Sequence, residues 1–278
     1  MKLRKVTAAS AAVLALAVGA TACGGGKKDD NGSSGGGKKI AIGIKFDQPG
    51  LGQKTPQGYA GFDVDVATYV AKKLGYSADQ IEWKESKSAD RETMLQRGDV
   101  DFIAATYSIT PKREAKVDFA GPYYVAGQQI LTRKGDSSIT GPDSFRDGTK
   151  KVCSVTGSTP AANIEKYLKD KATQLVLFDV YNKCADAVKN KQVDALTTDN
   201  VILSGFVSQN PNDFQLVGSK FTQEPYGIGV KKGDTAFRNF INDVLEKIAK
   251  DGRYEKAWKD TVGKVDPNTP TAPAVNRY

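Results

Sequence analysis

The sequence predicts an α/β protein, because short apolar segments alternate with amphipathic ones along most of its length. Residues 39–44, 81–83 and 100–105 are apolar runs typical of buried strands. Between them, residues 61–74 and 91–96 place their apolar side chains on one helical face. This alternation favours mainly parallel sheets flanked by helices.

A second set of such units follows after Tyr123. The expected strands and helices alternate over residues 151–155, 160–169, 175–178, 182–190, 193–197 and 200–208. Asp199 or Asn200 is a suitable N-cap for the last of these helices. Residues 267–278 contain three prolines and no periodicity, which predicts a disordered tail.

Composition excludes several classes of function. The net charge of the 278 residues is +8, but Lys2, Arg4 and Lys5 contribute three of these charges, and 8 − 3 leaves +5. The other basic residues are scattered among acids, so we expect no nucleic-acid partner. The chain has no histidine and only three cysteines, which disfavours histidine-based triads and zinc sites; we expect no metal and no cofactor.

The N-terminus has the pattern of an export signal. Residues 1–5 are basic and residues 6–22 are uncharged, ending in small residues before Cys23. A transmembrane anchor is the alternative, although the run is rich in alanine and at the short end of the ~17–25 residues that span a bilayer.

Small residues directly before a cysteine resemble a bacterial lipoprotein cleavage site, although Ala20 stands where leucine is usual. Residues 1–22 are then a signal peptide, and Cys23 carries the lipid (palmitate). Residues 23–37 would form a flexible tether. This predicts a protein anchored at the extracytoplasmic face of the bacterial cell membrane.

Cys153 and Cys184 remain once Cys23 is assigned to the lipid. In an exported chain, two cysteines favour one disulfide, which would stabilise the fold by about 3 kcal/mol in the chain-entropy model. The alternative is a pair of buried free thiols.

Residues 104–113 combine a strand end, a hydroxyl-rich turn and a basic helix start. Thr106 and Ser108 lie close in sequence to Arg113, and hydroxyls, amides and a guanidinium are the groups that hold a small carboxylate. An ordinary turn and helix start with a solvated arginine would use the same residue types.

The run Gly61–Val66, with sequence GFDVDV, resembles the signature of the extracytoplasmic solute-binding proteins of polar amino-acid ABC importers, family 3. By themselves, Asp63 and Asp65 in this run could simply complement a helix dipole. Residues 118–123 and 226–230 resemble further segments of the family, and the resemblance covers residues 38 to 262. Within the family the chain looks closest to actinobacterial glutamate-binding lipoproteins.

The resemblance implies a two-lobed clamp of the type II periplasmic-binding-protein class. Residues 38–125 and 224–266 would form lobe one and residues 130–219 lobe two, each a mostly parallel sheet flanked by helices, with two crossing strands as the hinge. A ligand between the lobes would close them. The closed form of this expected monomer would be recognised by a membrane permease.

The resemblance also implies roles for individual residues. Arg113 and Ser108 match the ligands of the amino acid's carboxylate, and Thr159 matches a contact from lobe two. Asp199, with the carbonyl of Thr106, matches the ammonium site. Helix capping is the alternative role for both Thr159 and Asp199.

Two further basic residues bear on the ligand's side chain. Lys45 lies where glutamine-binding relatives carry an acid, and Arg91 where binders of acidic amino acids carry arginine. Lys45, Arg91, Arg113 and Asp199 sum to +3 − 1 = +2, which favours glutamate; aspartate would lose reach. Both cations could instead be ordinary surface residues.

The resulting prediction is a non-enzymatic substrate-binding lipoprotein that delivers glutamate to an importer. Binding of glutamine or another polar amino acid is an alternative. A cyclohexadienyl-dehydratase-like enzyme on the same fold is another, although no catalytic constellation is evident in the sequence. Sensory modules also use this fold and normally continue into a membrane helix and a signalling domain. A purely structural surface lipoprotein would leave the cleft residues unexplained.

Overall fold

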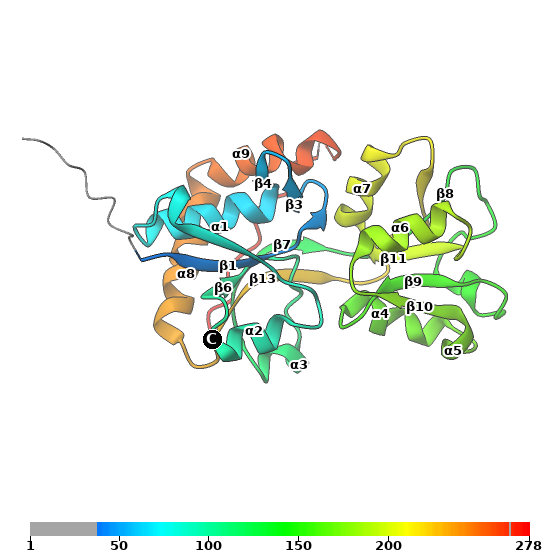
Figure 1. Cartoon of the computed structure of the whole chain (residues 1–278), viewed down its shortest axis with the longest axis horizontal. Coiled ribbons are helices and arrows are strands. Elements are labelled where there is room, and N and C mark those ends of the chain that lie inside the picture. The colour runs from blue at the N-terminus through cyan, green and yellow to red at the C-terminus, as the bar shows by residue number, and fades with distance from the viewer. Residues whose placement is uncertain (1–37, 267) are drawn as a thin grey trace, which may run out of the picture. The chain divides into compact units, whose positions relative to one another are not determined.

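The computed structural model describes residues 38–266 and 268–278, which contain two five-stranded sheets (Figure 1). The first sheet has the order β5-β1-β6-β13-β7. Its strands are β5 (Ile81–Glu85), β1 (Ile40–Ile44), β6 (Phe102–Ile103), β13 (Glu224–Val230) and β7 (Asp118–Ala126). We call this sheet and its helices lobe one.

The second sheet has the order β10-β9-β11-β8-β12 and belongs to lobe two. Its strands are β10 (Leu175–Phe178), β9 (Val152–Val155), β11 (Ala195–Asp199), β8 (Gln128–Arg133) and β12 (Phe214–Val217). The two-lobed architecture expected from the sequence is thus present.

Both sheets are mixed but mostly parallel, as expected, because in each of them one strand runs opposite to the other four. In lobe one, β1 runs parallel to β5 and β6, but β13 runs antiparallel to β6 and β7. In lobe two, β9 runs parallel to β10 and β11, but β8 runs antiparallel to β11 and β12. The antiparallel strands are those through which the chain passes from one sheet to the other.

The chain crosses between the sheets twice, from β7 to β8 and from β12 to β13. The two crossings touch at Gly127, where an added Cβ would lie 2.7 Å from the carbonyl oxygen of Thr222. The Thr222 hydroxyl also accepts a hydrogen bond from the Gln128 amide at 2.9 Å. These two segments form the connection between the lobes.

Helices lie on both faces of each sheet. In lobe one, α1 and α9 lie above the sheet and α2 and α3 below it; in lobe two, α6 and α7 lie above and α4 and α5 below (Figure 1). The helices are α1 (Phe62–Lys73), α2 (Arg91–Arg97), α3 (Pro111–Glu114), α4 (Thr159–Ile164), α5 (Lys171–Gln174), α6 (Tyr181–Lys189), α7 (Asn200–Gln209), α8 (Thr235–Lys250) and α9 (Arg253–Asp260). The helices predicted at residues 61–74, 91–96, 182–190 and 200–208 correspond to α1, α2, α6 and α7, whereas the helix predicted at 160–169 ends earlier, as α4.

The signature at residues 61–66 has a packing explanation at its start. Gly61 has φ 124°, and a Cβ there would lie 2.1 Å from the carbonyl oxygen of Leu51, so only glycine fits. Phe62 is fully buried and meets Tyr254 and Trp258 edge-to-face at centroid distances of 5.3 and 5.4 Å. These contacts fix the N-terminus of α1 between Leu51 and α9.

A small three-stranded sheet, absent from the sequence-based expectation, follows β1. Its strands are β2 (Asp47–Gln48), β3 (Gly52–Thr55) and β4 (Gly58–Ala60). Strands this short carry too few residues to show a period of two.

Cys153 on β9 and Cys184 on α6 form the expected disulfide. Both residues are fully buried, so the bond ties α6 to the sheet of lobe two from within the core.

The C-terminal residues differ from the expected disordered tail. The Asn276 amide donates to the Gly121 carbonyl at 2.8 Å, and the Phe119 amide donates to the Tyr278 hydroxyl at 3.0 Å, both on edge strand β7. The Arg238 guanidinium lies 4.2 Å from the centre of the Tyr278 ring. Sequence periodicity cannot reveal this order, because the contacts join positions far apart in the chain.

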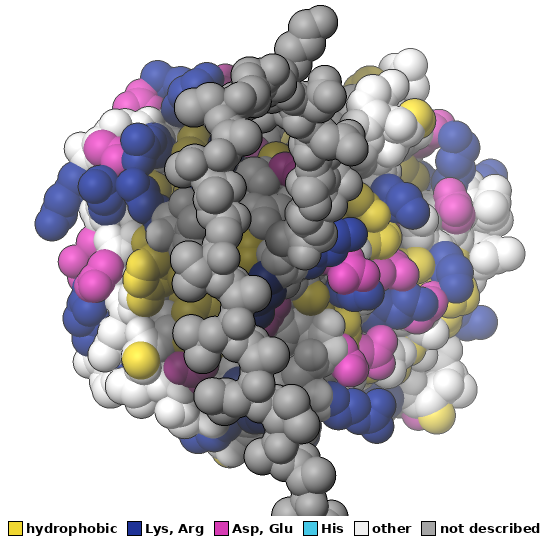
Figure 2. Space-filling model, turned by 60° about the vertical axis from the view of Figure 1, so that its left-hand side comes forward, with side chains coloured by type: hydrophobic (Ala, Val, Ile, Leu, Met, Phe, Trp, Pro, Cys, Tyr) yellow, Lys and Arg dark blue, Asp and Glu magenta, His cyan; other side chains and the backbone are white. Residues whose placement is uncertain are grey.

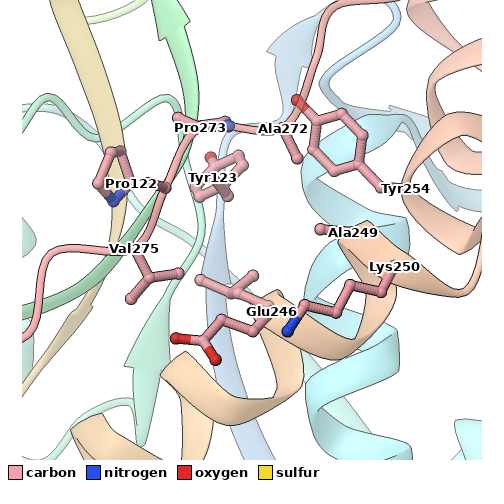
Figure 3. Close-up of a pocket in the computed structure, with 11 residues that line it drawn as sticks. Pro122, Tyr123, Glu246, Ala249, Lys250, Tyr254, Ala272, Pro273 and Val275 are labelled. Atoms are coloured by element: carbon pink, nitrogen blue, oxygen red, sulfur yellow. The ribbon is translucent and has the colours of Figure 1, made fainter.

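The tail also covers an apolar cavity in lobe one (Figure 3). Ala272, Pro273 and Val275 line it together with Tyr123 and Tyr254. This cavity offers mainly hydrophobic side chains and lies away from the hydroxyl-rich turn, so we place the functional site elsewhere.

On the face shown in Figure 2, basic and acidic side chains are interspersed. Within residues 38–266 and 268–278, no helix is both long and apolar enough to cross a bilayer. The same residues hold no cluster of three potential metal ligands. The predicted signal peptide, Cys23 and tether lie outside the described residues.

Candidate functional site

A polar cavity lies between the lobes, at the ends of strands from both sheets. Six of the seven ligand-binding residues expected from the sequence line it, and Lys45 does not. Its lining residues are Ser88, Arg91, Thr106, Ser108, Arg113, Ser158, Thr159, Pro160, Tyr181, Asp199 and Ile202.

Arg113 is fixed at the cavity by the turn that precedes it. Thr110 caps α3 by accepting a hydrogen bond from the Arg113 amide at 3.3 Å, and Pro111 occupies the first helical position. Arg113 is only 6% exposed, and its guanidinium donates to the carbonyls of Ser108 at 2.8 Å and Gly157 at 3.1 Å. A solvated surface arginine is therefore ruled out.

Two guanidinium groups lie against one aromatic ring. Arg91 and Arg113 lie 4.8 and 4.9 Å from the centre of the Tyr107 ring. Arg91 is only 2% exposed, and burial lowers its pKa, with the nearby Arg113 as the second cause. Both cations therefore gain from an anion in the cavity.

Asp63 forms a hydrogen bond with the backbone of the hydroxyl-rich turn in residues 104–113. Its carboxylate accepts hydrogen bonds from the Thr106 amide at 2.9 Å and from the Tyr123 hydroxyl at 2.7 Å. Thr106 has φ 47°, a left-handed conformation that is unusual for a β-branched residue. Burial raises the pKa of Asp63 to about 6. Asp63 thus does more than complement a helix dipole, because it stabilises the turn that lines the cavity.

Thr159 is not the N-cap of α4. Ser158 caps this helix by accepting from the Ala161 amide at 3.1 Å, which leaves the Thr159 hydroxyl free for other contacts. The Thr159 hydroxyl donates to Glu224 at 2.7 Å and lies 3.2 Å from the Ser108 hydroxyl. The Thr159 hydroxyl therefore links lobe two to Ser108, which lies in the hydroxyl-rich turn of lobe one.

Asp199 precedes α7, but its side chain makes no capping hydrogen bond. One carboxylate oxygen accepts from the Tyr226 hydroxyl at 2.5 Å, and the other has no hydrogen-bond partner within the described part of the chain. Burial raises the pKa of Asp199 to about 7, and the negative charge of Glu224 adds to this rise. A cation beside the free oxygen would offset the cost of the buried charge.

Lys45 occupies a different position from the one expected. It is only 1% exposed, so it is not a surface cation, but it lies outside the cavity lining. Its Nζ is 3.6 Å from the Asp47 carboxylate and 5.7 Å from the centre of the Tyr181 ring. Burial lowers its pKa. Lys45 thus lies beside Tyr181, which lines the cavity, and is not part of the lining itself.

The formal charge sum of +2 also needs revision. Glu92 lies 3.6 Å from Arg113, and Asp47 lies 3.6 Å from Lys45, so two of the three cations have an acid beside them. For Arg91, no carboxylate lies within 4.0 Å among residues 38–266 and 268–278. The remaining electrostatic demand for an anion is therefore concentrated at Arg91.

The lobes are in direct contact around the cavity. Besides the Ser108–Thr159 contact, Gly157 approaches lobe one so closely that a Cβ there would lie 2.8 Å from the Cα of Ala89. A cavity enclosed by both lobes could surround a small charged molecule from two sides.

The sequence of residues 40–263 matches the family model of bacterial extracellular solute-binding proteins, family 3. The chain belongs to this family. The resemblance stated from the signature is thus confirmed, and the family places the protein outside the cytoplasm.

Curated relatives match over most of their length. The glutamate-binding protein GluB of Corynebacterium efficiens is 41% identical over 272 residues, which cover 94% of this chain and 91% of the relative. The ABC transporter glutamine-binding protein GlnH of Bacillus subtilis is 42% identical over 231 residues, 82% of each chain.

Solved structures confirm the fold. An ancestral arginine-binding protein bound to arginine has a TM-score of 0.74 at 36% identity, covering 80% of this chain and 97% of that chain. A precursor of cyclohexadienyl dehydratase, itself an ancestral amino acid-binding protein, has a TM-score of 0.73 at 28% identity, covering 81% of this chain and 95% of that chain. The two-lobed type II fold is therefore that of the family.

Sequence reasoning missed several residues of the site. Glu224 is 3% exposed and contacts Thr159 and Asn163, yet it stands alone among uncharged neighbours in the sequence. Tyr181 lines the cavity from the start of α6. Neither carries a local signal, whereas Asp63 could have been singled out as an acid inside the family signature.

Proposed function

We propose that this protein is the substrate-binding lipoprotein of an ABC amino-acid importer and that it captures glutamate between its lobes. The lobes would close on the ligand, and the closed form would be delivered to the permease. Export and lipidation at Cys23 belong to the same proposal.

The uncompensated guanidinium of Arg91 is the observation that carries the choice of glutamate. A neutral ligand side chain would leave this buried cation without an anion, which is costly. A second carboxylate would form charge-assisted hydrogen bonds with it. The Nε of Arg91 has no hydrogen-bond partner within the described residues, so a donor is available.

The amino-acid part of the ligand finds complementary groups in the same cavity. Arg113, with Ser108 and Thr159, would hold the α-carboxylate. The free oxygen of Asp199 would accept a hydrogen bond from the ammonium group. Each charge of the zwitterion is thereby paired, as burial requires.

Calorimetric titration of the full-length protein with glutamate, glutamine, aspartate and asparagine tests the proposal. We expect glutamate to bind most tightly and to be recovered unchanged from the complex. Absence of binding by all four would contradict an amino-acid receptor, and chemical conversion of a bound acid would favour the dehydratase-like alternative.

Arg91→Gln tests the reading of the ligand's side chain. Loss of a charge-assisted bond worth about 1.5–3 kcal/mol should weaken glutamate binding roughly tenfold to a hundredfold, with a smaller effect on glutamine. Arg97→Gln, at the exposed end of the same helix, is the matched control. Equal losses for both ligands would show that Arg91 does not distinguish them.

Glutamine is the second candidate ligand, because the glutamine-binding relative has nearly the same identity to this chain, 42% over 82% of it, as the glutamate-binding one, 41% over 94%. Tighter binding of glutamine in the titration would favour it and would leave the rest of the site assignment intact.

The lipid anchor is tested separately: labelled palmitate should be incorporated into the wild-type protein but not into Cys23→Ser.

A further inference from the structure

A carboxylate on β2 caps a helix of lobe two. The loop after β2 accepts hydrogen bonds from the first two amides of α1, Phe62 to Gly50 at 2.9 Å and Asp63 to Leu51 at 3.1 Å, so the small sheet belongs to lobe one. The Tyr181 amide, at the start of α6, donates to the Asp47 carboxylate at 2.6 Å. Val180 occupies the N-cap position of α6, and valine has no side-chain oxygen to accept this bond. We call the contact between Asp47 and Tyr181 the interlobe cap.

Lys45 holds the capping carboxylate from the side of lobe one. Its Nζ lies 3.6 Å from the second oxygen of Asp47, and both side chains are almost completely buried, at 1% and 6% exposure. A buried carboxylate needs such a counter-charge. The lysine is thus engaged with Asp47 rather than with the cavity.

The interlobe cap lies directly behind the ligand cavity. Tyr181 contributes its side chain to the cavity lining, while its backbone amide is bound by Asp47. Fixing the start of α6 therefore fixes one wall of the site. The cap forms only when the two lobes are in contact, since its two partners come from different lobes.

We propose that Asp47, held by Lys45, is a positioning residue for ligand capture: the interlobe cap stabilises the closed arrangement without reading the ligand's side chain. This inference rests on the proposed function, because it concerns closure around an amino acid. It assigns to Lys45 a role different from the side-chain recognition expected from the sequence.

A second contact between the lobes provides an internal comparison. Lys87 of lobe one donates to Asp179, two residues before Tyr181, at 2.7 Å. These side chains are 34% and 41% exposed, and exposed ion pairs contribute little. Lys87→Ala thus removes an interlobe contact at the same place without touching the interlobe cap.

The test combines ligand affinity with amide exchange at Tyr181 in the full-length protein. Asp47→Ala should weaken glutamate and glutamine binding by the same factor, about fivefold for a lost cap of ~1 kcal/mol. With saturating glutamate, hydrogen–deuterium exchange at Tyr181 should be faster than in wild type. Asp47→Asn, which keeps an acceptor oxygen, should restore part of both properties, and Lys87→Ala should change neither by more than about twofold.

Lys45→Met keeps the inference testable if Asp47→Ala fails to fold. It should speed exchange at Tyr181 and leave the ratio of glutamate to glutamine affinity unchanged. A selective loss of glutamate binding in Asp47→Ala or Lys45→Met, or unchanged exchange at Tyr181, would overturn the inference alone. Failure of the wild-type protein to bind any amino acid would overturn the proposed function and, with it, the coupling to capture.

Discussion

At the scale of single residues, Asp199 shows how burial prepares a site for a cation. Its pKa rises from 3.8 to about 7, mainly because it is buried and secondarily because Glu224 is negative. A carboxyl group whose pKa is higher in the folded than in the unfolded protein stabilises the folded state when that group is protonated. That contribution is fully present below pH ~4 and is lost as the pH rises through about 7.

Asp199→Asn should therefore change the pH dependence of stability in the absence of ligand. The melting temperature of the variant should exceed that of wild type by several degrees at pH 8, with the difference shrinking toward pH 4.5. Thermal melts across this range measure the difference. A difference that does not vary with pH would show that Asp199 is not the titrating group.

Saturating glutamate provides the control for this experiment. Its ammonium would compensate the ionised Asp199, so the destabilisation of wild type at pH 8 should largely disappear. Wild type that remains equally destabilised with bound glutamate would contradict the placement of the ammonium at Asp199.

At the scale of secondary structure, α7 meets lobe one through a glycine. A Cβ on Gly205 would lie 2.4 Å from the carbonyl oxygen of Pro49, which follows β2. The helix itself does not need glycine here, because alanine in a helix interior is more favourable by about 0.5–1 kcal/mol. Gly205 thus favours contact between the lobes at a cost to its own helix.

Gly205→Ala should separate stability from binding. We expect an equal or higher melting temperature without ligand and at least a tenfold loss of glutamate affinity, because the added methyl group obstructs closure. Calorimetry and thermal melts measure the two quantities. Ser204→Ala, its neighbour on α7, is the control; equal affinities for both variants would contradict a role of Gly205 in closure.

At the scale of the whole folded domain, the C-terminal residues join the edge of a sheet to a helix. Arg277 forms ion pairs with Asp243 and Glu246 on α8, at 2.6 and 2.9 Å. Asn276 and Tyr278 bind β7, which leads into the connection between the lobes. The tail therefore covers a strand edge that would otherwise expose unpaired backbone groups.

Ending the chain after Asp266 should lower the free energy of unfolding by about 2 kcal/mol, since it removes a cation–π contact and several hydrogen bonds. The preference among amino-acid ligands should stay the same, because the tail lies outside the cavity. Denaturant unfolding measures the first effect and titration the second.

Tyr278→Phe is the matched variant for this truncation. It keeps the ring beside Arg238 and removes only the hydroxyl that accepts from Phe119, so its stability should lie close to that of wild type. An unchanged free energy of unfolding in the truncated chain would contradict the role assigned to the tail.

Periodicity and local chemistry in the sequence predicted most helices and the strands β1, β5, β9, β10 and β11, but not β7, β8 and β13, which are the three longest strands. The helix expected at residues 91–96 is α2 over Arg91–Arg97, and the strand expected at 175–178 is β10. The three short strands after β1 and the ordered tail escaped prediction, because neither has a period that a core imposes. The one reversed strand in each sheet, β13 and β8, was not predicted either, since pairing direction depends on the return of distant strands.

The sequence by itself determined the α/β class, the family and most of the cavity residues, because these depend on local pattern and on a contiguous signature. The tertiary structure alone decided which partners those residues have. In the folded protein Lys45 lies beside Asp47, and Glu224 contacts Thr159 at the site. The side chains of Thr159 and Asp199 do not cap the helices at which they lie. These contacts join residues far apart in the chain. Packing sets their distances, burial and charge environment, so the local sequence around each residue does not indicate them.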